Sequence, residues 1–148
     1  MRRIINFLKY DVPSGIKNLI SWFPVIWKDR DWDDSFIFII IRKKLIRVEK
    51  LLRHNSHYIG AEQDADDVKV CILLLTRIID DEYFNNYMIP FEKKWGKNSW
   101  DIFNKDYKEN PDRTKDFSKV TEQENHSKQQ DIEYLFKLLT KHIQSWWD

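Results

Sequence analysis

The stretch Phe36–Arg53, which reads Phe-Ile-Phe-Ile-Ile-Ile-Arg-Lys-Lys-Leu-Ile-Arg-Val-Glu-Lys-Leu-Leu-Arg, decides the fold class. Its core-forming residues recur at helical spacing, at Ile37, Ile41, Leu45, Val48 and Leu52. A strand over the first six residues is the alternative, because they are apolar and largely β-branched. We reject the strand because the helical period continues through Val48. The stretch therefore predicts an amphipathic helix.

The rest of the chain also favours helices, since three glycines and four prolines in 148 residues are too few for many short strands. Further helices are expected over residues 2–10, 15–27, 62–88 and 122–147. Pro13 should end the first helix, and Pro24 should kink or break the second. Residues 88–104 are expected to be irregular or briefly helical, and the strongly polar residues 104–130 to form a loop or a partly disordered segment.

We therefore predict an all-α fold, a helical bundle of about four to six helices with a long polar loop before the last helix. In the second helix the expected inward-facing residues are Ile16, Leu19, Ile20 and Phe23. The apolar end at Trp146 and Trp147 should pack against the body of the protein, because such a terminus is rarely left in water.

Length and composition indicate one domain over residues 1–148. Lys plus Arg (25) nearly cancels Asp plus Glu (24), so no long nucleic acid is expected as a partner. No apolar run approaches the roughly 20 residues of a membrane span, and we therefore expect no membrane partner. The single cysteine, Cys71, lies in an apolar run without a disulfide partner, which indicates a cytoplasmic setting.

The segment from Trp22 to Asp34 mixes tryptophans with charged residues. Trp22, Trp27 and Trp32 are five residues apart, which is about 140° per step on a helix, so they do not share one core stripe. One interpretation is a buried corner between helices. The other is a recognition surface in which rings stack on a nucleobase and cations pair with phosphate. Its candidate ligand-binding residues are Trp27, Lys28, Arg30, Trp32, Arg42 and Lys43.

Arg77 joins this set because it follows Leu73, Leu74 and Leu75, where burial is expected and a guanidinium needs partners.

Motifs for catalysis are weak. Asp64-x-x-Asp67 and Asp31-x-x-Asp34 have a spacing that can hold magnesium, but both pairs sit at predicted helix starts, where Asp is favoured regardless of function. His54 and His57 lie near the first pair and are read as ordinary loop histidines. No catalytic residue, metal or cofactor is therefore expected, and we leave open whether the protein is an enzyme.

Three segments resemble a group of small, uncharacterised bacteriophage proteins: Trp22–Asp34, Leu74–Tyr83 and the terminal Trp146-Trp147-Asp148. The group shares a tryptophan-proline motif of this type, a helix with Arg-x-x-Asp-Asp and a Trp-Trp-Asp end. The resemblance implies a virus-encoded protein of the infected bacterial cytoplasm, and it carries no activity with it. Small phage proteins of this kind often interfere with host defence.

The first functional hypothesis is a non-catalytic phage protein, a homo-oligomer, that sequesters a small nucleotide-like immune signal. The alternative is a protein–protein interaction module in which the tryptophans anchor a host or phage protein. A third hypothesis is a metal-dependent nucleotide hydrolase.

Overall fold

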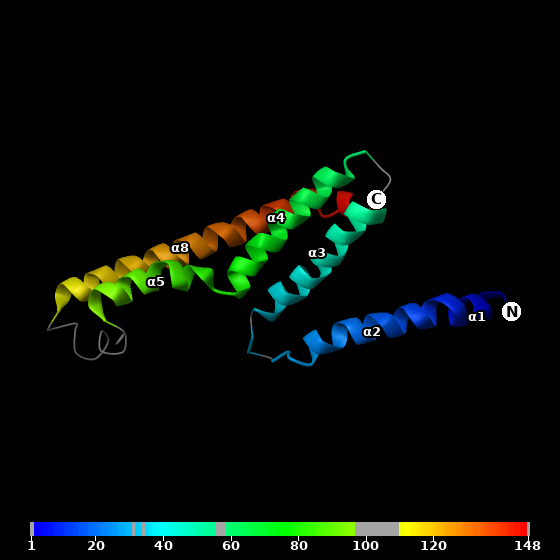
Figure 1. Cartoon of the computed structure of the whole chain (residues 1–148), viewed down its shortest axis with the longest axis horizontal. Coiled ribbons are helices and arrows are strands. Elements are labelled where there is room, and N and C mark those ends of the chain that lie inside the picture. The colour runs from blue at the N-terminus through cyan, green and yellow to red at the C-terminus, as the bar shows by residue number, and fades with distance from the viewer. Residues whose placement is uncertain (1, 31, 34, 56–58, 97–109, 148) are drawn as a thin grey trace. The chain divides into compact units, whose positions relative to one another are not determined.

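The computed structural model describes residues 2–30, 32–33, 35–55, 59–96 and 110–147, and it is all-α over these residues (Figure 1). The chain divides into two compact units, Met1–Ile40 and Ile41–Asp148, which we describe one at a time. The expectation of one domain over residues 1–148 stays a prediction. None of the helices in the described part of the chain is long and apolar enough to cross a membrane.

The first unit is dominated by one helical run, made of α1 (Arg2–Asn6), the π-helical turn η1 (Phe7–Asp11) and α2 (Val12–Ile26). We call this run the arm. The expected break before Pro13 is wrong, because the N–H of Val12 bonds to the carbonyl of Phe7 and the backbone stays helical across the junction. Pro13 is tolerated at the start of α2, where its missing N–H costs little and the π-turn widens the backbone.

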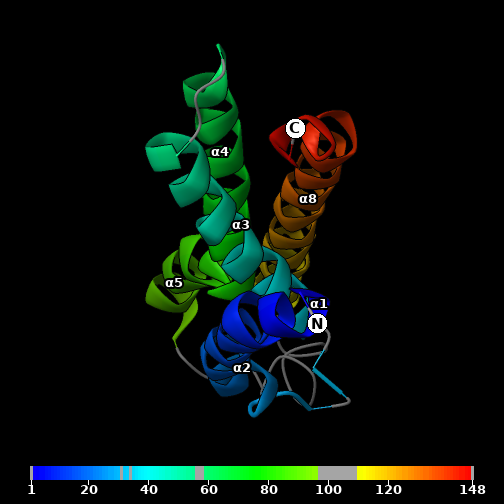
Figure 2. The same cartoon turned by 90° about the vertical axis from the view of Figure 1, so that its right-hand side faces the viewer.

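The second unit is built on α4 (Ala61–Ile79), α5 (Glu82–Trp95) and α8 (Pro111–His142), and α8 packs along both of the others (Figures 1 and 2). Its core is apolar and closely packed, with the fully buried residues Val68, Cys71, Leu75 and Leu135. A second cluster joins α5 to α8, where Met88 and Phe91 are covered by Trp95, Phe117 and Val120.

The expected helix over residues 62–88 is wrong in its extent, because the chain turns at Asp80–Asp81 between α4 and α5. Asp81 adopts a left-handed conformation with φ of 48°, which ends one helix and starts the next. Aspartate tolerates this conformation better than most residues do. Residues 88–95, expected to be irregular or briefly helical, continue α5 through Pro90.

Residues 111–121, expected to belong to the polar loop, are helical and form the start of α8. Residues 122–130, included both in the expected loop and in the expected last helix, continue it. Asn110 caps this helix by accepting a hydrogen bond from the N–H of Arg113 (3.3 Å), and Pro111 takes the first helical position. Phe117 and Val120 then pack against α5, so sparse apolar residues are enough to hold the helix. Residues 104–109 of the expected loop lie outside the described residues.

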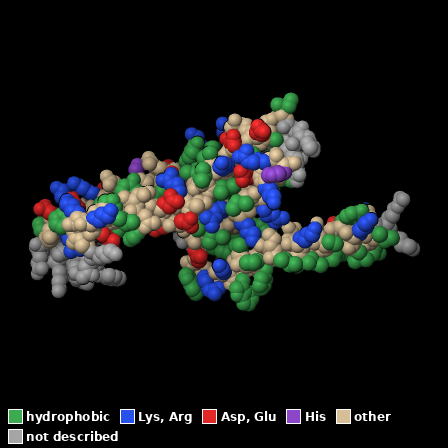
Figure 3. All heavy atoms as spheres, viewed as in Figure 1, with side chains coloured by type: hydrophobic (Ala, Val, Ile, Leu, Met, Phe, Trp, Pro, Cys, Tyr) green, Lys and Arg blue, Asp and Glu red, His purple; other side chains and the backbone are tan. Residues whose placement is uncertain are grey.

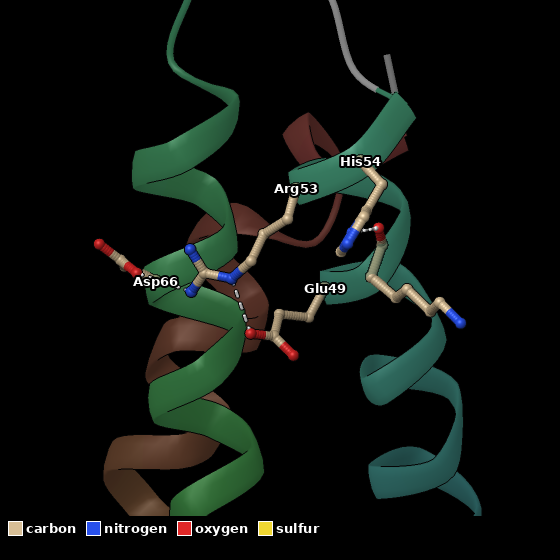
Figure 4. Close-up of polar contacts among 5 residues, drawn as sticks. Glu49, Arg53, His54 and Asp66 are labelled. Carbon is tan, nitrogen blue, oxygen red and sulfur yellow. Dashed lines mark hydrogen bonds and ion pairs between the residues drawn. The ribbon is translucent and has the colours of Figure 1, made fainter.

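The helix α3 (Phe36–Asn55) agrees with the prediction for its stretch. In the second unit Leu45, Val48 and Leu52 are buried as expected, whereas Ile37 in the first unit is exposed. A polar link ties α3 to α4: Arg53 donates to Glu49 and to Asp66, each at 2.8 Å (Figure 4). At the other end of the chain Trp146 is buried, which confirms the expected packing of this residue.

Candidate functional site

The two later tryptophans of the Trp22–Asp34 segment are largely exposed, Trp27 by 71% and Trp32 by 82%. The ring of Trp27 lies beside that of Phe23, with 5.3 Å between the ring centroids. Neither tryptophan therefore fills a buried corner, and the recognition surface stays a prediction.

Arg30 and Lys28 are also exposed, and Arg30 is partly engaged by the backbone. Its Nη1 donates to the carbonyl of Asp29 at 2.6 Å and to that of Trp27 at 3.4 Å. A cation bonded to carbonyls just after a helix end is stabilised by the helix dipole. Part of the hydrogen-bonding capacity that a phosphate would need is thus already used.

The remaining predicted ligand-binding residues, Arg42, Lys43 and Arg77, belong to the second unit. Arg42 donates from Nη1 to the Thr76 hydroxyl at 3.4 Å and lies 4.0 Å from the Asp80 carboxylate. Lys43 also has an interaction of its own. The predicted set is therefore divided between two units, with Trp27, Lys28, Arg30 and Trp32 in the first and Arg42, Lys43 and Arg77 in the second.

Arg77 has polar partners, but its side chain is 43% exposed, so the burial expected for it is wrong. Its Nη1 lies 3.0 Å from the carboxylate of Asp131, and its guanidinium lies over the ring of Tyr83, 5.3 Å from the centroid. The Tyr83 hydroxyl donates to the same carboxylate at 2.5 Å. Burial, followed by this hydrogen bond, raises the pKa of Tyr83 well above its usual range. The hydroxyl stays protonated at neutral pH, so the trio is a structural cross-link between helices.

A group of possible metal ligands joins the start of α4 to the end of α8. One ligand atom each from Asp64, Asp67 and His142 lies within 4.8 Å of the others, and the ring of His142 stacks near Trp146. Sequence reasoning singled out the two aspartates but missed His142, which no local spacing connects to them. Acidic groups at a helix start and a basic group at a helix end are explained by the helix dipole, so the group does not by itself indicate a bound ion.

The other histidines weighed from the sequence do not join this group among the described residues. His54 contacts the carbonyl of Lys50 at 3.0 Å (Figure 4), and His57 lies outside the described residues.

A polar hollow of about 370 Å³ lies between α5 and α8. Three of its polar groups pair with one another, because Asp116 accepts from Lys94 at 2.6 Å and from the indole of Trp95 at 3.1 Å. Lys94 also covers the Trp95 ring, 4.8 Å from its centroid. This hollow therefore gives no clear indication of a ligand.

The most unusual surface of the chain is the apolar side of the arm. No residue of η1 or α2 is buried, and the four residues expected to face inward are exposed by 50–72%: Ile16, Leu19, Ile20 and Phe23. That expectation is wrong. Figure 3 shows a row of hydrophobic side chains along one edge of the arm, and Lys and Arg side chains together with some hydrophobic ones on the opposite edge.

The π-turn keeps the apolar residues before it and after it on the same side of the arm. Ile4, Leu8, Val12 and Ile16 are four residues apart, and in a regular α-helix such a row drifts by about 40° per step. A turn with i→i+5 hydrogen bonds contains an extra residue and takes up this drift. We call the exposed set the docking face: Ile4, Leu8, Ile16, Leu19, Ile20, Phe23, Ile26 and Trp27.

Comparisons with family models, curated proteins and solved structures found no match to this chain. The resemblance to small phage proteins therefore stays a prediction.

Proposed function

We propose that the protein is a non-catalytic interaction module that works by docking its arm on an apolar surface outside its own fold. The observation that carries the proposal is the docking face, a continuous set of large apolar side chains on a helix with no buried residue. Exposed apolar patches of this extent mark interaction sites in soluble proteins.

The energy available from the docking face is large enough for binding. Fully burying a large apolar side chain contributes about 1.5–3 kcal/mol, so eight partly exposed ones supply on the order of 10 kcal/mol. Association itself costs roughly 4–15 kcal/mol. The face therefore supports reversible docking, with further contacts setting its strength.

Two reactive side chains of the second unit support a non-catalytic role. Burial, reinforced by the charge of Asp67, raises the pKa of the Cys71 thiol to about 11, so little nucleophilic thiolate forms at neutral pH. The Tyr83 hydroxyl is likewise held protonated. The metal-dependent hydrolase hypothesis gains no observation beyond the group at His142.

Sequestration of a small nucleotide-like immune signal by a phage-encoded homo-oligomer is the second candidate. The exposed rings of Trp27 and Trp32 favour it, since free aromatic faces stack on bases for about 1–3 kcal/mol each. Calorimetric titration with cyclic dinucleotides and cyclic ADP-ribose isomers tests it, with Arg30→Ala as the matched variant. Heat that Arg30→Ala abolishes would favour this candidate over docking.

Cysteine labelling tests the docking proposal without knowledge of the partner. The native Cys71 is buried and gives a low background, so one cysteine can be added at Leu19 on the docking face or at Lys17 on the polar side. We expect a maleimide to label both variants in the purified protein. In an extract of the expressing bacterium, we expect Leu19→Cys alone to be protected.

Two results would contradict the proposal. Equal labelling of the two variants in the extract would show that nothing covers the docking face. Protection of Leu19→Cys already in the dilute purified protein would show that the chain covers this face itself.

A further inference from the structure

We infer that the surface taken by the docking face is the interface of an anionic phospholipid bilayer, with the arm lying in the plane of the membrane. The inference rests on the proposed docking function and names its partner.

The charges of the arm favour an anionic surface. From Arg2 to Ile26 the arm has four cations, Arg2, Arg3, Lys9 and Lys17, against the single carboxylate of Asp11. Lys17 lies away from the docking face, on the side that also carries Ser14 and Ser21. A helix with an apolar face and a Lys/Arg-rich polar face binds at the boundary between headgroups and acyl chains.

The aromatic end of the docking face fits the same surface. Trp27 is 71% exposed, and its ring pairs an apolar body with a polar N–H. Side chains of this kind are enriched at the membrane–water interface.

The length of the apolar side also favours a flat, extended surface. It runs from Ile4 to Trp27, and 24 helical residues span about 36 Å. A helix that docks in a protein groove typically uses a few anchor residues at i, i+3 or i+4 and i+7. These anchors extend over about two helical turns. Pairing of two identical arms would bring together four cations from each arm with one carboxylate from each, that of Asp11.

The expectation of no membrane partner was derived from the lack of a spanning segment. A helix that lies in the interface needs an apolar face and not a run of some 20 apolar residues. The two criteria are independent, so the inference does not conflict with the finding on spanning helices.

Vesicle co-sedimentation of the full chain tests the inference. We expect binding to vesicles of phosphatidylcholine with roughly 30% phosphatidylglycerol, and at least tenfold weaker binding to pure phosphatidylcholine. Each Lys near an anionic surface contributes about 1 kcal/mol, so Lys9→Gln with Lys17→Gln should weaken binding roughly 30-fold. Phe23→Ser should weaken it at least tenfold, with loss of any blue shift in tryptophan fluorescence.

Matched controls come from the second unit, where Lys137 and Phe136 are also exposed. Lys137→Gln and Phe136→Ser should bind the anionic vesicles as the wild type does. Circular dichroism of each variant checks that it is folded.

The possible outcomes separate this inference from the docking proposal. If the protein does not bind vesicles but Leu19→Cys is protected in the extract, the inference of a lipid partner is refuted. Docking on a protein partner then remains. Protection of purified Leu19→Cys that grows with concentration overturns it in favour of a second copy. Equal binding to neutral and anionic vesicles overturns the role of the cations. Without any protection of Leu19→Cys in the extract, the docking proposal fails as well.

Discussion

Replacing one buried and one exposed tryptophan by alanine should give very different losses of stability. Trp146 is 2% exposed, and Trp27 is 71% exposed. A tryptophan side chain presents roughly 250 Å². Trp146→Ala removes a fully buried ring and should lower the free energy of unfolding by about 3–5 kcal/mol. At 2–4 °C per kcal/mol, the melting temperature should fall by roughly 6–20 °C.

Trp27 buries less than a third of its surface, which corresponds to about 70 Å² and at most about 2 kcal/mol at 25 cal/mol per Å². The contact with Phe23 lies within the arm, so its loss should hardly affect the second unit. We therefore expect Trp27→Ala to melt within about 2 °C of the wild type.

Urea unfolding followed by circular dichroism, together with thermal melts, measures both variants. A cost for Trp27→Ala equal to that for Trp146→Ala would refute the reasoning, because it would show that the Trp27 ring is buried in the folded protein.

Three further predictions concern the second unit. The pKa of the Cys71 thiol is raised from 9.0 to about 11, so the unfolded chain loses this proton at a lower pH than the folded protein does. The free energy of unfolding should therefore fall between about pH 9 and pH 11, and it should fall less in Cys71→Ala. Urea unfolding at each pH measures both. Asp131→Ala leaves the Tyr83 hydroxyl and Arg77 without their shared acceptor and should cost about 1–3 kcal/mol, more than Tyr83→Phe; a neutral effect in melting experiments would argue against the cross-link. Asn110→Ala removes a helix cap and should cost about 0.5–2 kcal/mol with faster amide exchange at the start of α8, whereas unchanged exchange would mean that the cap contributes nothing.

The sequence was sufficient to predict the fold class and the best-defined helix. The apolar period of Phe36–Arg53 correctly identified α3 and its buried residues Leu45, Val48 and Leu52. Helix boundaries were harder to predict. Pro13 was expected to end a helix and Pro24 to kink or break one, but helical backbone continues through both. At Pro13 the preceding π-turn and the position in the first turn of α2 remove much of the cost.

The start of α8 was missed for a different reason. Its first residues are mostly polar, which on composition alone indicates a loop. The Asn110-Pro111 pair is a helix-start signal that the sequence does contain. The local composition does not show that α5 packs beside this segment. In the folded protein, Met88 and Phe91 of α5 form the apolar surface on which Phe117 packs.

The candidate surface was predicted only in part. The unusual spacing of Trp27 and Trp32 pointed to residues outside the core, and their exposure agrees with this. The apolar residues of α2 were assigned to the core because an amphipathic pattern predicts that one face is covered, without saying by what. His142 was missed because its position beside Asp64 and Asp67 depends on the packing of two helices far apart in the sequence.

The central claim is that the arm has no buried core residues. Hydrogen–deuterium exchange of the full purified chain tests this claim most directly. Amides of residues 2–27 should exchange much faster than those of α4, α5 and α8, because opening a helix without buried side chains costs little. Anionic vesicles should then slow exchange in residues 2–27 and leave α8 unchanged. Protection of residues 2–27 in the protein alone, equal to that of α8, would contradict the account.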